Sequence, residues 1–216
     1  MERATWRLVL PVKGGDAAKS RLAPSGPGRT ALALAIGLDT VDSALACPAV
    51  AEVVVVSADE DVLRPAEALG ARAVAERTPG AGLLAAVADG LDAAGRGPCA
   101  VLLADLPSLR PGDLTAALDA CAAALGGGAS SVVVPDAEGT GSVLLAGTDR
   151  VALLPAFGPS SAVAHVRAGA ARLDLDLPRL RRDVDTPAEL RVAEALGVGP
   201  RTRAVLGAVG ARRGVA

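Results

Sequence analysis

Residues 99–107 read CAVLLADLP, an apolar run of strand length that is followed by an aspartate and a proline. A second run of this kind, VVVV at Val53–Val56, is followed by Ser57. Neither run alternates apolar with polar residues, which is typical of strands that are covered on both faces. Strands of this type belong to parallel sheets, so the two runs predict an α/β protein.

Other segments of strand length alternate along the chain with segments of helical spacing. The expected strands are Arg7–Val12, Glu52–Ser57, Arg72–Ala75, Cys99–Ala104, Ser130–Pro135, Ser142–Ala146 and Arg172–Leu175. The expected helices are Arg29–Leu45, Asp61–Leu69, Leu83–Ala94, Leu114–Leu125, Ala162–Ala168 and Pro187–Leu196. This alternation predicts an open, mostly parallel sheet with helices on both faces.

The composition sets limits on domain number and on partners. The chain has 216 residues, a formal net charge of −2, one Trp, one Phe and no Tyr. This length predicts a single domain over residues 1–216. The small net charge and the scarcity of aromatic side chains argue against a nucleic-acid partner. We leave the order of the Gly-, Ala- and Arg-rich tail, residues 197–216, open and assign it no role.

The cysteines and the hydropathy pattern predict a cytoplasmic protein that does not associate with a membrane. Cys47, Cys99 and Cys121 are widely spaced and form no C-x-x-C pair, which favours free thiols in a reducing compartment. No signal-peptide pattern is present at the N-terminus. No apolar stretch reaches the roughly 18 to 20 residues that a membrane helix requires.

Ligands of open α/β sheets bind beyond the carboxyl ends of the strands, and several polar residues are expected there. Lys13 follows the first strand, Ser57 the second, and Asp105 the run at residues 99–104. After Lys13 come two glycines and then Lys19 and Arg21. No standard phosphate-binding glycine motif is present. A glycine-containing basic loop of this kind suits a triphosphate, since arginine and lysine bind phosphate oxygens.

Carboxylates in two segments predict a metal site. Asp105 precedes Pro107, and Asp183 and Asp185 lie in the segment DVDTP at residues 183–187. Two protein carboxylates together with substrate phosphates can support Mg²⁺. Both Asp183 and Asp185 are candidates, and only one of them is expected to be a direct ligand while the other caps or orients. Asp105 could instead cap the helix that begins near Pro111. Basic residues and metal-binding carboxylates at strand ends predict a nucleotidyltransferase.

Small polar residues form a further candidate site. Thr140 and Ser142 lie in a glycine-rich turn, and Gly158, Ser160 and Ser161 precede a predicted helix. Exposed N–H groups and hydroxyls at a helix start can bind an anion, whereas a serine there can equally be a simple N-cap. His165, the only histidine, follows on the same helix, and we interpret it as a structural or supporting residue rather than a base.

These motifs, in this order, resemble the guanylyltransferases of deazaflavin coenzyme F420 biosynthesis, which activate phosphoenolpyruvate or 2-phospholactate with GTP. The matching segments cover most of the chain: Pro11–Lys13, Ala18–Leu22, Ala104–Pro107, Gly139–Ser142, Phe157–Ala162 and Asp183–Pro187. The family fold is a Rossmann-like sandwich of the nucleotide-diphospho-sugar-transferase type. This chain has Ser142 where the family usually carries Thr, and Leu84 where a family Asn is common.

The resemblance implies a role for each site residue. Asp105 and Asp183 would hold Mg²⁺, with Asp185 beside them, and Lys13, Lys19, Arg21 and Asp105 would be catalytic. The residues expected at the nucleotide are Pro11, Val12, Lys13, Lys19, Ser57 and Gly82. The residues expected at phosphoenolpyruvate are Thr140, Ser142, Gly158 and Ser161. A composition typical of high-GC bacteria favours phosphoenolpyruvate by family association. The downstream deazaflavin transferase is an expected partner, and a homodimer remains open.

Three other interpretations remain at the level of sequence. The same reaction could act on 2-phospholactate or 3-phosphoglycerate. A nucleotide-sugar-dependent glycosyltransferase would share the sheet and the carboxylates, but it has no need of Lys19 and Arg21 for a departing pyrophosphate. A non-catalytic module that only binds a nucleotide would not need both Asp105 and Asp183.

Overall fold

A mixed sheet of seven strands forms the centre of the described part of the chain, in the order β3-β2-β1-β4-β6-β5-β7. The computed structural model describes residues 5–14, 22 and 27–213. The strands are β1 Trp6–Pro11, β2 Val50–Ser57, β3 Arg72–Ala75, β4 Cys99–Leu102, β5 Ser131–Pro135, β6 Ser142–Gly147 and β7 Ala171–Arg172. The helices are α1 Pro27–Leu45, α2 Glu60–Ala68, α3 Leu83–Ala93, α4 Pro111–Gly126, α5 Ser161–Arg167, α6 Pro178–Arg181, α7 Pro187–Leu196 and α8 Pro200–Arg213, with a 3₁₀ turn, η1, at Arg150–Ala152.

Strand direction explains where the polar residues gather. β1 is parallel to β2 and β4, whereas β6 is antiparallel to both β4 and β5. The carboxyl ends of β1, β2, β4 and β5 therefore share one edge of the sheet with the amino end of β6. The prediction of a mostly parallel mixed sheet is confirmed.

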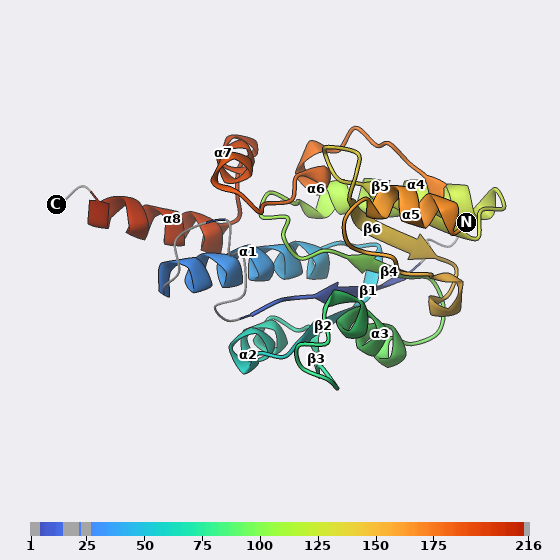
Figure 1. Cartoon of the computed structure of the whole chain (residues 1–216), viewed down its shortest axis with the longest axis horizontal. Coiled ribbons are helices and arrows are strands. Elements are labelled where there is room, and N and C mark those ends of the chain that lie inside the picture. Colours follow the sequence, from blue (N-terminus) through green and yellow to red (C-terminus); the bar gives the residue numbers. More distant parts are fainter. Residues whose placement is uncertain (1–4, 15–21, 23–26, 214–216) are drawn as a thin grey trace.

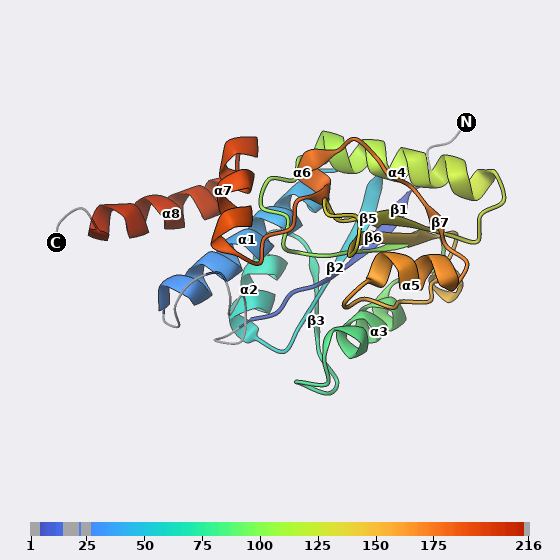
Figure 2. The ribbon, with the colours of Figure 1, turned by 45° about the horizontal axis from the view of Figure 1, so that its top comes forward.

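Helices cover both faces of the sheet, as Figure 2 shows for α4 on one side and α3 and α5 on the other. Leu8 and Leu10 of β1 pack in a cluster with side chains of α1, α2 and α4. Val9, between them, packs in a second cluster with side chains of α3. Successive residues of a strand point to opposite faces, so an unbroken apolar strand is what a sheet with two covered faces requires.

The C-terminal tail, to which the sequence assigned no role, contains a helix that packs against α1 (Figure 1). Asp39 of α1 accepts hydrogen bonds from the backbone N–H groups of Arg201 and Thr202, at 3.1 and 2.8 Å. The carboxylate thus satisfies N–H groups in the first turn of α8, which have no partner inside their own helix. Asp39 is 3% exposed, and it fixes the start of α8 on the domain.

Most predicted elements occur within a few residues of their expected limits, and two differences are informative. The predicted strand Arg172–Leu175 is wrong beyond Arg172, because the pairing of β7 with β5 ends with the hydrogen bond from Leu173 N–H to the carbonyl of Val133, and the chain then leads to α6. The predicted helix at Leu114 instead begins at Pro111, a residue that a first helical turn accepts readily.

Two features of the structure relate to the predictions of free cysteine thiols and of no membrane helix. Cys47, Cys99 and Cys121 are free and buried, as predicted, and burial raises the pKa of the Cys99 and Cys121 thiols to about 12. Among the residues that the structure describes, none of the helices combines the length and the hydrophobicity of a membrane span.

Candidate active site

Asp105 and the 183–187 segment meet at the carboxyl edge of the sheet. The N–H of Val184 donates to the backbone carbonyl of Asp105 at 3.1 Å, which joins two segments far apart in the sequence. Leu103 donates to the carbonyl of Val143 at 3.0 Å, so the end of β4 also lies beside the start of β6. The structure thus brings together the two carboxylate-bearing segments that the sequence proposed as a metal site.

The side chain of Asp183 lies in an environment that disfavours its negative charge. Burial raises its pKa to about 7, and the charges of Asp105 and Asp136 add to the shift. A carboxylate that is buried beside other carboxylates is stabilised by a cation. The donors are all oxygen atoms, which suits a hard divalent ion, so the residues present fit a metal of this kind. We refer to Asp105, Asp136 and Asp183 as the carboxylate cluster.

Asp136 is the member of this cluster that the sequence analysis missed. One oxygen each of Asp136, Glu138 and Asp183 lies within 4.8 Å of the others. Asp136 follows β5 just as Asp105 follows β4, so its position at a strand end was the available signal. Its carboxylate accepts N–H groups of Thr140 and Gly141 at 2.9 and 2.7 Å, and it therefore organises the turn that leads into β6. Glu138 pairs with Arg182.

The structure tests whether Asp105 caps a helix and which of Asp183 and Asp185 lies near the other carboxylates. The N-cap residue of α4 is Arg110, so the interpretation of Asp105 as the cap of this helix is wrong. Asp185 is exposed, and its N–H donates to Glu189. Thr186 and Glu189 form a capping box at the start of α7. The charges of Asp105 and Asp136 help to raise the pKa of Asp183, which indicates that Asp183 lies near both carboxylates.

The ends of β1 and β2 form a second part of the edge. Val12 is buried and Lys13 is exposed, directly before Gly14. Gly14 lies so close to Asp59 that a Cβ at this position would overlap the Asp59 side chain. The N–H of Asp59 donates to Ser57 Oγ at 3.1 Å, and its carboxylate accepts the N–H of Asp61 at the start of α2. The backbone after β1 is thus held against the end of β2.

Two residues of the predicted basic loop, Lys19 and Arg21, lie outside the described residues. Gly82 is exposed and directly precedes α3, whose first residues, Leu83 and Leu84, are 40% and 48% exposed. Leu84 therefore presents an apolar surface where the resembling family often has an amide.

The small polar residues gather around His165. Ser142 Oγ and His165 Nδ1 are 2.9 Å apart, and the N–H of Ala156 donates to His165 Nε2 at 2.8 Å. Ser142, Ser161 and His165 are 3%, 1% and 1% exposed. Burial lowers the pKa of the imidazole, which keeps the ring neutral. We call Ser142, Ser161 and His165 the serine–histidine cluster.

The segment before α5 has a constrained backbone. Gly158 has φ +143°, a region that favours glycine, and Ser160 has φ 56°, in the left-handed region. Ser160 is the N-cap residue of α5, as the alternative interpretation predicted, but its side chain makes no capping hydrogen bond. Thr140 is exposed, and its carbonyl accepts the N–H of Ala162 at 3.1 Å. The Gly139–Ser142 and Phe157–Ala162 segments are thereby joined.

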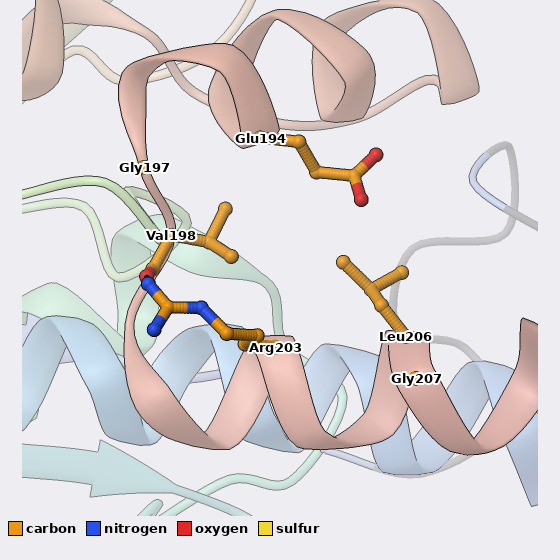
Figure 3. Close-up of a pocket in the computed structure, with 6 residues that line it drawn as sticks. All are labelled: Glu194, Gly197, Val198, Arg203, Leu206 and Gly207. Carbon is orange, nitrogen blue, oxygen red and sulfur yellow. The ribbon is translucent and has the colours of Figure 1, made fainter.

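A pocket of about 360 Å³ lies elsewhere, between α7 and α8. Figure 3 shows Glu194 on α7 and Leu206 on α8 on opposite sides of this space. The guanidinium of Arg203 lies at the pocket wall and donates a hydrogen bond to the carbonyl of Val198 at 3.0 Å. None of the residues that line this pocket belongs to the predicted site.

The fold and the site define a class of protein, the MobA-like NTP transferases, and the model of the MobA-like NTP transferase domain matches residues 38–175. Solved structures agree on the fold. A CMP:2-keto-3-deoxy-manno-octonic acid synthetase complexed with CTP superposes with a TM-score of 0.58 at 17% identity, over 89% of this chain and 98% of that one. A Mycobacterium tuberculosis protein solved in complex with manganese gives 0.54 at 20% identity, over 88% and 97%.

Proteins that are similar in sequence identify the family within this class. A protein of Salinispora arenicola named phosphoenolpyruvate guanylyltransferase is 50% identical over 94% of each chain. One of the same name from Thermomonospora curvata is 48% identical over 93% of this chain and 88% of its own length. The chain belongs to the phosphoenolpyruvate guanylyltransferase family, as the motifs of the sequence had indicated.

Proposed function

We propose that the protein transfers GMP from GTP to phosphoenolpyruvate, forming enolpyruvyl-diphosphoguanosine and pyrophosphate as a step of deazaflavin coenzyme F420 biosynthesis. The observation that carries this proposal is the junction of the carboxylate cluster with the amino end of β6. At this junction, buried carboxylates lie beside the start of β6, at the edge where α/β sheets bind nucleotides, which supports a metal-assisted transfer there. The names of the relatives supply the nucleotide and the acceptor.

In the proposed reaction, a phosphate oxygen of phosphoenolpyruvate attacks the α-phosphorus of GTP. A new P–O bond forms there, the bond from the α-phosphorus to the oxygen bridging to the β-phosphate breaks, and pyrophosphate leaves with the electron pair. The attacking oxygen is already anionic, so no general base is required. The protein then has to hold two anions in line and to offset their charge.

Each part of the edge has a role in this proposal. Asp105 and Asp183 would hold Mg²⁺, with Asp185 beside them, and the ion would supply charge neutralisation where the phosphates meet. Lys13, together with Lys19 and Arg21, would contact the triphosphate. Pro11, Val12, Ser57 and Gly82 would line the nucleotide site. Thr140, Ser142, Gly158 and Ser161 would contact phosphoenolpyruvate.

The test is pyrophosphate release with Mg²⁺ from each of GTP, ATP and CTP, combined with each of phosphoenolpyruvate, 2-phospholactate and 3-phosphoglycerate. The proposal expects release that requires GTP and phosphoenolpyruvate and that is abolished by Asp105→Ala. Asp119→Ala on the outer part of α4 is the matched control and should retain the rate. Release with a different acceptor would correct the substrate, and no release from any pair by a folded, GTP-binding protein would refute the transferase.

A further inference from the structure

His165 makes two hydrogen bonds that together determine which ring nitrogen carries the proton. The backbone N–H of Ala156 can only donate, so Nε2, at 2.8 Å, must accept with its lone pair. A neutral imidazole then carries its proton on Nδ1, and burial keeps the ring neutral by lowering its pKa. Nδ1 lies 2.9 Å from Ser142 Oγ, so the Nδ1–H donates to this hydroxyl.

This tautomer has a consequence for Ser142. A serine hydroxyl has one proton and two lone pairs. Since Ser142 Oγ accepts from His165, its own O–H remains available to donate to another oxygen. Ser142 is 3% exposed and begins β6, beside the carboxyl end of β4 that leads to Asp105. An oxygen of a bound anion is the acceptor that this position favours.

The ring itself is held in place from several sides. The side chain of Phe157 contacts it edge to face, with the ring centroids 5.0 Å apart and an interplanar angle of 73°. His165 is 1% exposed, and its N–H partner Ala156 lies two residues before Gly158. One side chain therefore connects Ser142 on β6 with the segment that carries Gly158.

We propose that His165 is a positioning residue that fixes Ser142 as a hydrogen-bond donor to the phosphorylated acid, while its second hydrogen bond, from Ala156, anchors the ring in the fold. The inference rests on the proposed function for the identity of that ligand. His165 is not a base in this account, because Ala156 occupies Nε2 and Ser142 occupies Nδ1. Its effect is on binding of the acid, not on the nucleotide.

Two substitutions separate the two hydrogen bonds. In His165→Asn, the amide can reach the Nδ1 position and donate to Ser142, but no atom remains to accept from Ala156. In His165→Gln, the side-chain carbonyl can reach the Nε2 position and accept from Ala156, but the donor to Ser142 is lost. His165→Gln should raise the KM for phosphoenolpyruvate about 5- to 10-fold, the effect of one hydrogen bond, with the KM for GTP unchanged. His165→Asn should lower the melting temperature more and the affinity for the acid less.

A double-mutant cycle tests whether His165 acts through Ser142. In a Ser142→Ala background, His165→Gln should have little further effect on the KM for the acid. Ser142→Thr is the control that keeps the hydroxyl, and it should retain near-normal affinity. Equal KM increases from the Asn and Gln variants, or full additivity with Ser142→Ala, would overturn the inference.

A second readout does not depend on turnover. The sequence contains one histidine, so ¹⁵N NMR of protein without a histidine tag reports a single imidazole. The inference expects a neutral ring with the proton on Nδ1 at pH 7, and an Nε2–H tautomer or a charged ring would contradict it. Failure of the wild type to use phosphoenolpyruvate would refute the acceptor in the proposed function, whereas the NMR result would still decide the tautomer.

Discussion

The carboxylate cluster and the serine–histidine cluster lie at the same edge of the sheet, but they differ in how well their polar groups are satisfied without a ligand. In the serine–histidine cluster the ring is neutral and both of its nitrogens have partners before any ligand binds. In the carboxylate cluster, burial and neighbouring charges raise the pKa of Asp183 to about 7. The first region is organised by the fold alone, whereas the second would be stabilised further by a cation. In the proposed function, the metal would complete the carboxylate cluster and the acid would enter a preformed site.

The largest expected effect comes from removing charge from the carboxylate cluster. Asp183→Asn should lower kcat/KM for pyrophosphate release at least about 100-fold, because the proposed ion loses a direct ligand. Asp185→Asn is the matched control, and it should have a much smaller effect, since Asp185 is exposed and lies outside the cluster. Steady-state rates measured over a range of Mg²⁺ concentrations would check this, and equal losses in both variants would contradict the assignment of Asp183.

Asp136 connects the two regions, so its loss should affect both. Asp136→Asn keeps one oxygen acceptor for the N–H groups of Thr140 and Gly141 but removes the charge. We expect a roughly 10-fold higher KM for phosphoenolpyruvate, because the turn before Ser142 loses part of its support. Asp119→Asn, at an exposed position of α4 away from this turn, should change the KM little. The KM values for the acid and for GTP, measured separately, test this prediction.

A smaller effect is expected after β1 and β2, where the nucleotide is proposed to bind. In Gly14→Ala, the new Cβ would overlap the side chain of Asp59, so either this side chain or the backbone after β1 must move. We expect the KM for GTP to rise about 3- to 5-fold while the KM for the acid stays unchanged. Gly112→Ala is a suitable control because a Cβ there meets no other atom within 4 Å. An increase in the KM for the acid instead would mean that the two ends of the site are not separate.

The smallest effect is on stability and follows from the raised pKa of Asp183. In an unfolded chain this carboxyl titrates near 3.8, whereas in the folded protein it titrates near 7, so the folded state binds the proton more tightly. The stabilising contribution is therefore complete below pH 3.8 and is lost as the pH rises through about 7. Without metal, Asp183→Asn should melt about 2–6 °C above the wild type at pH 8.

Calorimetry in EDTA at pH 5.5 and pH 8 would measure this difference, and adding Mg²⁺ at pH 8 should stabilise the wild type more than the Asn variant. A variant that melts below the wild type at pH 8 in EDTA would contradict the idea that charge is disfavoured at Asp183. Asp185→Asn again serves as the control.

The sequence was sufficient to predict the elements whose signals are local. The unbroken apolar runs indicated β2 and β4, and the helical spacing of Pro187–Leu196 indicated α7. Asp105 could be selected because it follows an apolar strand, and Asp183 because it lies in the segment DVDTP at residues 183–187. Their proximity could only be inferred, since it depends on a hydrogen bond between Val184 and Asp105.

Other features depend on contacts between residues far apart in the sequence and could not be predicted. The partners Ser142 and His165 lie on β6 and α5, and only the antiparallel direction of β6 brings the start of that strand to the site. Docking of α8 depends on Asp39, which is separated from Thr202 by most of the chain. Asp136 carried a usable signal, its place after an apolar strand, but Pro135 and the following glycine-rich turn suggested only a loop.

The most direct test of guanylyl transfer follows the oxygen atoms. Phosphoenolpyruvate carrying ¹⁸O in its phosphate group is incubated with unlabelled GTP, Mg²⁺ and the enzyme, and the products are analysed by mass spectrometry. If the acid's phosphate attacks the α-phosphorus, all of the label remains in the diphosphate-linked nucleotide product, and the pyrophosphate carries none. Label in the pyrophosphate, or pyrophosphate formed together with unlabelled GMP alone, would contradict the proposed reaction.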